Sequence, residues 1–469
     1  MSDISQHNGA ELLRLYRRKE LSPVAVARDA LDRIARYEPQ INAFVLVDED
    51  GALAAARASE TRWLKGEPMG LVDGLPATIK DIIDVNGKPT RKGSLTTPAT
   101  PVAHDAPAVA RLKEQGAVIL GKTTTPEFGW IGACHSPLTG ITRNPWNMTR
   151  TTGGSSGGAA AAALLNLGIL HLGTDGAGSI RIPAAFSGVF GIKPSYGRVP
   201  AYPASAFTVL AHQGPLTRTV SDAALMLSII GQPDMRDTTA WNTPAPDYRV
   251  GLDDGVRGLR VAWSPRLGYV KELDADVEAA ARKAAQVFAD LGAHVEEVDP
   301  GFAEPIDLEK KVWYAVASTL VYGLPPAEQE KMDPGLRRMA DEGRRYSLAD
   351  YLAAHMQRTE LALHMLRFHA RYDLLLTPQM PVPAIEAGRV TPADGRFGDE
   401  WINWSPYTYP FNLTQQPAAS VPCGFASDGL PVALQIVGPP RRDELVLRAA
   451  RAYESACPFA RLAAPREAK

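Results

Sequence analysis

Three residues stand where their types and surroundings could support nucleophilic chemistry. Ser155 lies in the glycine-rich stretch "TTGGSSGGAAAAAL" (151–164), and Ser179 closes a second glycine-rich turn, "GTDGAGS" (173–179). Lys80 lies in "GLPATIKDIIDV" (74–85), which is otherwise largely apolar. A serine hydroxyl is a weak nucleophile that needs a base, and a lysine whose charged form is desolvated can supply one near neutral pH. A surface lysine at a strand end would have no such role, and this second interpretation of Lys80 is open at this point.

The stretch around Ser155 allows several interpretations. It continues into alanine and leucine, which favours a tight loop that opens a helix over a flexible linker. A phosphate-binding loop would need a Lys-Ser or Lys-Thr pair after the glycines, and none follows. Residues 154–158 satisfy G-x-S-x-G, which would make Ser156 the nucleophile of an elbow, but "RNPWNMTRTT" (143–152) shows no clear strand before it. A purely structural glycine loop is also open.

Five segments of the chain together resemble the amidase signature family. They are "GLPATIKDIIDV", "AVARLKEQGAVILGKTTTPEFG", "TTGGSSGGAAAAAL", "GTDGAGSIRIPAAFSGVFGIKPSYGRVP" and "FNLTQQPAASVPCGFASDGLPVALQIVG". The resemblance extends from about residue 8 to about residue 455. Ordered blocks with matching spacing are far more specific than the lone elbow motif.

The resemblance implies a serine hydrolase with a Ser-cisSer-Lys triad. In this sequence Ser179 would be the nucleophile, Ser155 the bridging serine after a cis peptide bond, and Lys80 the base. Gly154, which precedes the bridging serine, would lower crowding there. The implied chemistry is acyl transfer through an acyl-enzyme, and it requires no metal and no cofactor.

The resemblance also places the oxyanion hole in backbone amides of the second turn. These amides belong to Gly176, Ala177, Gly178 and Ser179. The family usually has D-x-G-G-S at this point, whereas this chain has D-G-A-G-S. An alanine at position 177 is strained if the backbone there needs a positive φ, and harmless otherwise.

Other polar residues near these motifs are interpreted as supports. Asp175 and Arg181 bracket the second turn and would hold its shape, and Ser156 would hydrogen-bond near Lys80 or Ser155. The chain has no H-E-x-x-H and no C-x-x-C, so no metal site is predicted. Cys134 is better explained by packing than as a cysteine nucleophile with its neighbour His135.

The elements that must position these residues follow an α/β pattern. Ser22 and Pro23 predict a capped helix over "VAVARDALDRIARY", and "PAVARLKEQGAVILGKTT" predicts a helix, a stop at Gly116 and a strand. Apolar residues at 277, 281, 284, 288 and 291 predict another helix before a strand. With the resemblance, this pattern predicts an α/β fold with a large mixed β-sheet core covered by helices, and a helical insert or cap.

We expect one amidase signature domain over residues 1–469. Within it we predict a helical N-terminal segment at 1–65, a catalytic core at 70–230, and a variable helical segment at 303–370. Core strands and a helix would follow at 371–460, where "YDLLLTP" and "LPVALQIVG" are strand-like. No tandem repeat or domain-joining linker interrupts the chain.

Composition excludes several classes of partner. The 469 residues carry 50 Lys and Arg against 52 Asp and Glu, a net charge of −2, which gives no electrostatic footprint for nucleic acid or a membrane surface. Three cysteines fit a reducing compartment, and no apolar leader opens the chain, so we expect a cytoplasmic protein. The expected partner is a small amide substrate, and a homodimer is left open.

The sequence indicates the type of reaction more clearly than it indicates the substrate. Aromatic and Met residues occur in "WINWSPYTYPFN" and in the helical segment, and such residues more often belong to the hydrophobic core than to a pocket. Any of them that line the site favour an apolar or aryl substrate. They are Trp401, Trp404, Tyr407, Tyr409, Trp313, Tyr314, Tyr322, Met332, Met339 and Met356. We predict a stand-alone amide hydrolase, with aryl amides, esters and carbamates open as substrates. The alternatives are the glutamine-hydrolysing component of a tRNA-dependent amidotransferase and an inactive scaffold, and the intact Lys80, Ser155 and Ser179 speak against the scaffold.

Overall fold

A sheet of eleven strands runs through the molecule, which a computed structural model describes for residues 4–466. Its spatial order is β1-β3-β2-β8-β10-β9-β14-β15-β13-β11-β12. The bounds are β1 (Phe44–Val47), β2 (Pro76–Lys80), β3 (Val118–Thr123), β8 (Leu170–Asp175), β9 (Phe190–Lys193), β10 (His212–Thr217), β11 (Arg260–Trp263), β12 (His294–Glu297), β13 (Leu374–Pro378), β14 (Ala418–Phe425) and β15 (Pro431–Val437).

The sheet is mixed. β2 pairs in parallel with both β3 and β8, and β11 pairs in parallel with β12 and β13. The remaining pairs, including β10 with β8 and β14 with β15, are antiparallel. The predicted fold class, a large mixed sheet covered by helices, is therefore confirmed.

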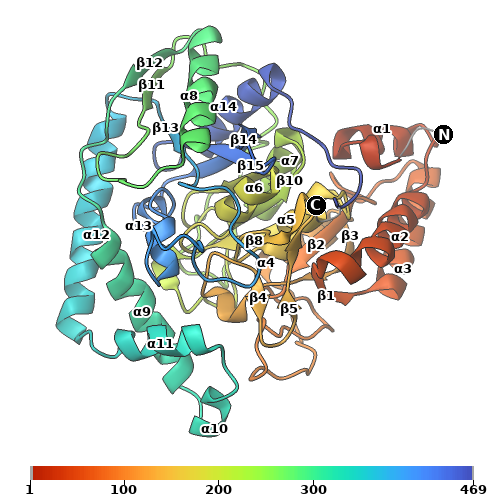
Figure 1. Cartoon of the computed structure of the whole chain (residues 1–469). Helices are drawn as coiled ribbons and strands as arrows, with labels where there is room; N and C mark the ends of the chain where they lie inside the picture. The colour runs from red at the N-terminus through yellow and green to blue at the C-terminus, as the bar shows by residue number, and fades with distance from the viewer. Residues whose placement is uncertain (1–3, 467–469) are drawn as a thin grey trace.

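Helices cover the sheet on both sides (Figure 1). They are α1 (Gly9–Arg17), α2 (Pro23–Ile41), α3 (Glu49–Lys65), α4 (Pro107–Glu114), α5 (Gly157–Leu164), α6 (Arg181–Ser187), α7 (Val220–Ile230), α8 (Ala275–Asp290), α9 (Ile306–Tyr322), α10 (Pro326–Gln329), α11 (Pro334–Gly343), α12 (Leu348–His369), α13 (Pro410–Leu413) and α14 (Asp443–Ala456). Short 3₁₀ helices are η1 (Ile4–Gln6), η2 (Glu127–Gly129), η3 (Thr208–Leu210) and η4 (Trp401–Trp404).

Local sequence signals explain several of these boundaries. The Ser22 side chain accepts a hydrogen bond from the amide of Val24, and Pro23 occupies the first position of α2, as predicted. Gly116 has a φ of 85° after α4, a conformation that glycine adopts without steric cost, and the chain then enters β3. α8 buries the apolar stripe that predicted it, including Val277 and Phe288.

The N-terminal segment differs from the prediction. We expected 1–65 to be helical, but "FVLV" forms β1 between α2 and α3. β1 is the edge strand of the sheet and pairs antiparallel with β3. Four residues are too few to show a strand period in the sequence, and pairing with β3 decides their conformation.

Two short buried helices lie at the centre of the molecule and carry the serine motifs. Every residue of α5 and α6 is buried. In α5 a side chain on Gly158 would lie 2.4 Å from the carbonyl oxygen of Ala43, so the Gly-Ala composition allows close packing. "RNPWNMTRTT" does contain strands, β6 (Arg143–Asn144) and β7 (Asn147–Thr151), but they form a separate two-stranded sheet. β4 (His135–Ser136) and β5 (Gly140–Ile141) form another.

The predicted helical segment at 303–370 contains α9, α10, α11 and α12. In Figure 1 these helices lie on the opposite side of the molecule from α1, α2 and α3. α9 packs against both α11 and α12. Within residues 4–466, no helix is both long enough and apolar enough to cross a bilayer.

Candidate active site

Lys80 is the last residue of β2, and its side chain is 0% exposed. Its Nζ lies 2.6 Å from Ser155 Oγ, 2.8 Å from Thr174 Oγ1 and 3.0 Å from Ser156 Oγ. The two serines precede α5, and Thr174 lies near the end of β8. Two segments, the loop before α5 and the end of β8, thus bring three hydroxyl groups around one buried amine at the end of β2.

The hydrogen bonds around Ser156 restrict what the lysine can do. Ser156 Oγ donates to the carbonyl oxygen of Thr174 at 3.1 Å and accepts from the Thr174 amide at 3.2 Å. Because its proton is already directed to that carbonyl, Ser156 can only accept a hydrogen bond from Lys80. A neutral Lys80 amine has one lone pair, which is therefore available to the hydroxyl of Ser155 or of Thr174.

The environment of Lys80 favours this neutral amine. Burial lowers the pKa of Lys80 from its ordinary value of 10.5 to about 7, and the weaker attractions of Cys134 and Asp175 act in the opposite direction. Desolvation disfavours a charged ammonium in the same way at any buried site without a counter-charge in contact. Near neutral pH, roughly half of the molecules then hold Lys80 with a free lone pair.

Ser155 and Ser179 meet at the same place from different elements. The Gly154–Ser155 peptide bond is cis, as the resemblance implies, and Gly154 is required because a side chain would lie 2.2 Å from the carbonyl oxygen of Ala133. The Ser156 amide donates to the carbonyl oxygen of Ser179 at 3.1 Å, which ties the two serine loops together. Ser155 and Ser179 are 2% and 6% exposed, and both border one pocket.

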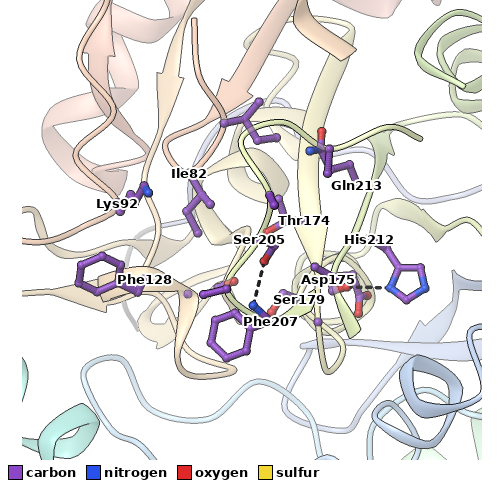
Figure 2. A pocket seen from close by; sticks show the side chains of 18 of the residues that line it. Ile82, Lys92, Phe128, Thr174, Asp175, Ser179, Ser205, Phe207, His212 and Gln213 are labelled. Atoms are coloured by element: carbon purple, nitrogen blue, oxygen red, sulfur yellow. Dashed lines mark hydrogen bonds between the residues drawn. The ribbon is translucent and has the colours of Figure 1, made fainter. Parts of the chain in front are cut away.

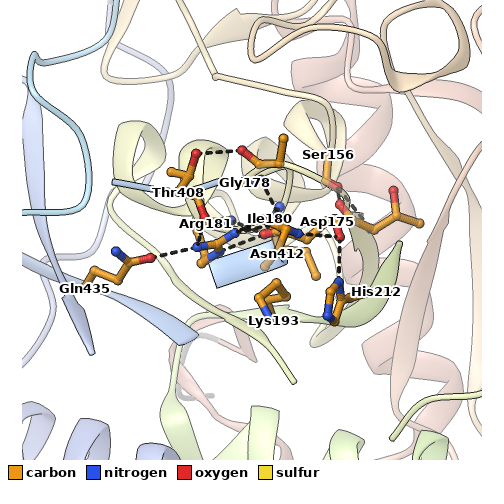
Figure 3. A network of polar contacts seen from close by, with 12 residues as sticks. Ser156, Asp175, Gly178, Ile180, Arg181, Lys193, His212, Thr408, Asn412 and Gln435 are labelled. Atoms are coloured by element: carbon orange, nitrogen blue, oxygen red, sulfur yellow. Dashed lines mark hydrogen bonds and ion pairs between the residues drawn. The ribbon is translucent and has the colours of Figure 1, made fainter. Parts of the chain in front are cut away.

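Asp175 and Arg181 form a buried ion pair that shapes the turn leading to Ser179 (Figure 3). The Asp175 carboxylate accepts hydrogen bonds from the amides of Gly178 and Ile180 at 2.7 and 3.1 Å, and from Arg181 Nε at 3.0 Å. Burial alone would raise the pKa of Asp175, but the attraction and hydrogen bonds of Arg181 hold it below its ordinary range. The carboxylate therefore holds the shape of the turn through these hydrogen bonds.

Arg181 in turn connects this anchor to the C-terminal part of the chain. Its guanidinium donates to the carbonyl oxygen of Thr408 at 3.0 Å, to Gln435 Oε1 at 2.8 Å and to Asn412 Oδ1 at 2.5 Å. The Thr408 hydroxyl donates to the carbonyl oxygen of Ala177 at 2.6 Å. The segment before β14 thus fixes the back of the turn by direct hydrogen bonds.

The predicted oxyanion amides are not equivalent. The amide of Gly178 already donates to Asp175, so the prediction needs correction there: this amide holds the turn. Within the described residues, the amides of Gly176, Ala177 and Ser179 have no partner. Ala177 does not have a positive φ, so the alanine is unstrained, whereas Gly178 has a φ of 122°.

A pocket of about 170 Å³ opens in front of these serines (Figure 2). Its floor is formed by Ser155, Thr174, Gly176 and Ser179. Its apolar wall consists of Phe128, Phe207, Trp313 and Leu320, and its polar border includes Asp84, Lys92 and Gln213. The loop at 201–207 borders it as well. The Trp313 ring stacks on Phe207 with a centroid distance of 4.0 Å and lies where a side chain on Gly176 would be.

Comparison with known proteins agrees with this geometry. The family model described as Amidase matches residues 25–447. The chain belongs to the amidase signature family. This assigns it to a family of amide hydrolases and confirms the resemblance seen in the sequence.

Its relatives in the amidase signature family are described with more than one activity. An acylamidase of Rhodococcus erythropolis is 35% identical over 446 residues, which is 94% of this chain and 93% of the relative. The A component of the glutamyl-tRNA(Gln) amidotransferase of Myxococcus xanthus is 38% identical over 474 residues, with 95% and 96% covered. A bacterial aryl acylamidase of known structure superposes with a TM-score of 0.89 at 31% identity, over 96% of each chain.

The aromatic residues singled out in the sequence divide between core and pocket. Of that set, only Trp313 borders the pocket. Trp404 stacks on Phe186, and the Tyr407 hydroxyl donates to the carbonyl oxygen of Pro265, so both belong to the packed interior. The remaining members lie in the core or, like Met356, on the surface. Helical spacing alone could not show which side chain faces the pocket.

Two pocket residues of this amidase signature enzyme were missed. Thr174 receives a hydrogen bond from Lys80, and Gln213 lies opposite it on β10. The position of Thr174 directly before Asp175, at the end of a strand, could have marked it. Nothing in "AHQGPLT" indicates that Gln213 borders a pocket, because its pairing with β8 is a long-range contact.

The turn geometry predicts losses of stability of different size at two neighbouring positions. Ala177→Gly should keep the turn and cost about 1 kcal/mol of unfolding free energy, because glycine adds chain entropy to the unfolded state and one buried methyl group is lost. Gly178→Ala should cost more, about 1–3 kcal/mol, because its Cβ would lie 2.7 Å from Thr408 Cβ at a φ of 122°. Urea unfolding of both variants measures this. Equal stabilities would contradict the described turn.

Proposed function

We propose that this protein hydrolyses carboxylic amides through an acyl-enzyme on Ser179. One observation carries the proposal: the buried Lys80 Nζ lies 2.6 Å from Ser155 Oγ, and Ser155 and Ser179 border the same pocket. This arrangement supplies a base, a relay and a nucleophile in order. Membership of the amidase signature family supports the same reaction class.

The proposed reaction begins with proton transfer. Neutral Lys80 takes the proton of Ser155, and Ser155 takes that of Ser179, whose Oγ attacks the amide carbon. The carbonyl oxygen becomes an oxyanion, and the free amides of Gly176, Ala177 and Ser179 are the donors that could stabilise it. Backbone amides fixed by the Asp175 anchor do not need to reorganise as the charge develops.

The second half of the reaction returns the protons. As the tetrahedral intermediate collapses, the C–N bond breaks and Ser155 gives its proton to the leaving amine, and the Lys80 ammonium restores the proton of Ser155. A water molecule then attacks the acyl-enzyme by the same relay, which releases the carboxylic acid and regenerates Ser179. A pKa near 7 suits Lys80 to both roles, as base and as acid.

The pocket wall supports an apolar or aryl portion in the substrate. Phe128, Phe207, Trp313 and Leu320 provide aromatic and aliphatic surface beside the reacting serines. A relative described as an acylamidase and a structural neighbour described as an aryl acylamidase agree with this class. Esters and carbamates with the same aryl group belong in the same assay because their carbonyl carbon is attacked in the same way.

A second candidate function is glutamine hydrolysis within a tRNA-dependent amidotransferase. The observation in its favour is the 38% identity to the amidotransferase component of Myxococcus xanthus. The pocket is bordered by the ammonium of Lys92 and by the carboxylates of Asp84 and Asp175. Both carboxylates already have a partner: Asp84 lies 3.0 Å from His104 Nε2, and Asp175 pairs with Arg181. Release of ammonia from glutamine at a rate above that for aryl amides would favour this candidate.

Substitutions of the hydroxyl and amine groups test the proposed mechanism. Ser179→Ala should reduce kcat for an aryl amide by about 10⁴-fold or more, because the nucleophile is lost. Ser155→Ala and Lys80→Ala should each reduce it by about 10²–10⁴-fold, because the proton relay is broken. Ser156→Ala should cost only about 10-fold, the value of one supporting hydrogen bond.

Amine release from a panel of anilides, aliphatic amides, esters and carbamates measures these rates. Circular dichroism of each variant checks that the fold is retained. If Ser156→Ala abolished turnover while Ser179→Ala kept it, the elbow interpretation would replace this mechanism.

The lowered pKa of Lys80 predicts the acid limb of the pH profile. Lys80 must be neutral to act, so kcat/KM for an uncharged anilide should fall about tenfold per pH unit below a pH of about 7. Above that pH the profile should be flat until other groups titrate. A limb centred near the ordinary lysine value of 10.5 would show that Lys80 is not desolvated during catalysis.

A further inference from the structure

Gln213 is a polar pocket residue that the proposed chemistry does not use. It is the second residue of β10 and lies directly opposite Thr174 in the antiparallel pairing with β8. Residues opposite each other in such a pair project from the same face of the sheet, so Gln213 lies beside the threonine that Lys80 contacts. Figure 2 shows its side chain beyond Thr174, away from Phe128 and Phe207.

Neither end of the Gln213 side-chain amide has a hydrogen-bond partner among the described residues. The residue is 9% exposed, and its Oε1 is fully buried with no hydrogen bond. No described residue pairs with its Nε2 either. A buried carbonyl oxygen without a hydrogen bond is destabilising, so a donor on a bound substrate would be favoured there. By contrast the buried Gln435 uses both ends of its amide, toward Arg181 on one side and Thr377 and Tyr407 on the other.

The chemistry of an amide limits which ligand group can complete it. Oε1 needs a donor, which a carboxylate lacks, and Nε2 needs an acceptor. An ammonium could donate to Oε1, but burying its charge is costly because the carboxylates at the pocket already have partners, Asp84 in His104 and Asp175 in Arg181. A neutral amide or urea group offers an N–H beside a C=O and matches both ends of Gln213.

We propose that Gln213 is a specificity residue that hydrogen-bonds a second amide-type group of the substrate. The proposal rests on the proposed hydrolysis at Ser179 and narrows its substrate class. The preferred substrates are small diamides or ureido amides, in which one amide is cleaved and the other is held at Gln213. The aromatic wall packs the remaining apolar part of the same molecule.

Matched substrates test this directly. In the acyl series, the reference compound is the para-nitroanilide of glutaramic acid, which ends in a carboxamide. Its methyl-ketone analogue replaces the terminal NH2 by a methyl group and so removes the N–H donor. Its isopropyl-terminated analogue also replaces the carbonyl oxygen by a methyl group and so removes the acceptor, at a similar size. In the amine series, N-benzoyl-β-alaninamide is compared with N-benzoyl-isopentylamine. The series that shows a preference identifies the side of the scissile bond on which Gln213 acts.

The wild-type protein should prefer the carboxamide by about 10–100-fold in kcat/KM in one series, with the methyl ketone between the extremes. Gln213→Met keeps the length of the side chain and removes its hydrogen bonding. It should lower kcat/KM for the carboxamide by that factor and change kcat/KM for the isopropyl analogue by less than about threefold.

Gln379→Met is the matched control, since Gln379 is also buried and unpaired but does not border the pocket. It should leave the substrate preference unchanged.

Calorimetric binding to the Ser179→Ala variant separates this proposal from the proposed function. Tighter binding of the carboxamide that is lost on adding Gln213→Met supports recognition by Gln213, even if the wild type cleaves none of the compounds. If the wild type cleaved none of the compounds, the hydrolysis proposal would be overturned, but the role of Gln213 in binding would not. Equal losses for carboxamide and isopropyl compounds in Gln213→Met, or no preference in either series, would overturn the role of Gln213.

Discussion

The burial of one amine is the constraint on which the rest of the site depends. Lys80 lies in the interior, and no carboxylate within residues 4–466 contacts it, so its amine is held by hydroxyls and its pKa falls to about 7. Supplying those hydroxyls requires the ends of β2 and β8 and the loop before α5 to converge, and the mixed order of the central sheet makes β2 and β8 neighbours. The short, glycine- and alanine-rich α5 then allows that loop to approach closely.

Arg181, a second buried basic residue at this site, differs from Lys80 because it contacts a carboxylate. Asp175 pairs with Arg181, and the pair fixes the turn that leads to Ser179. The helix α9 adds the wall above this turn, since Trp313 packs on Gly176 and Phe207. Two of the four wall residues, Trp313 and Leu320, thus come from α9, whereas Phe128 and Phe207 come from the same part of the chain as the reacting groups.

Much of this arrangement could be predicted from the sequence, because its signals are local. Helix caps such as Ser22 and the glycine motifs around Ser155 and Ser179 act over a few residues, and the spacing of the motifs identified the family. The parts that were missed depend on contacts between distant segments. β1 forms because it pairs with β3, Gly178 loses its free amide to Asp175, and Gln213 faces the pocket because β10 pairs with β8. No window of sequence contains both partners of such contacts.

The most direct measurement of the central claim is the position and rate of covalent labelling. An aryl fluorophosphonate should attach to the side chain whose oxygen is activated, and peptide mapping by tandem mass spectrometry locates it. This account predicts an adduct on Ser179, with a rate that falls as pH drops below about 7 and that is lost in the Lys80→Ala variant. An adduct on Ser155 or Ser156, or labelling of Ser179 at an unchanged rate without Lys80, would contradict it.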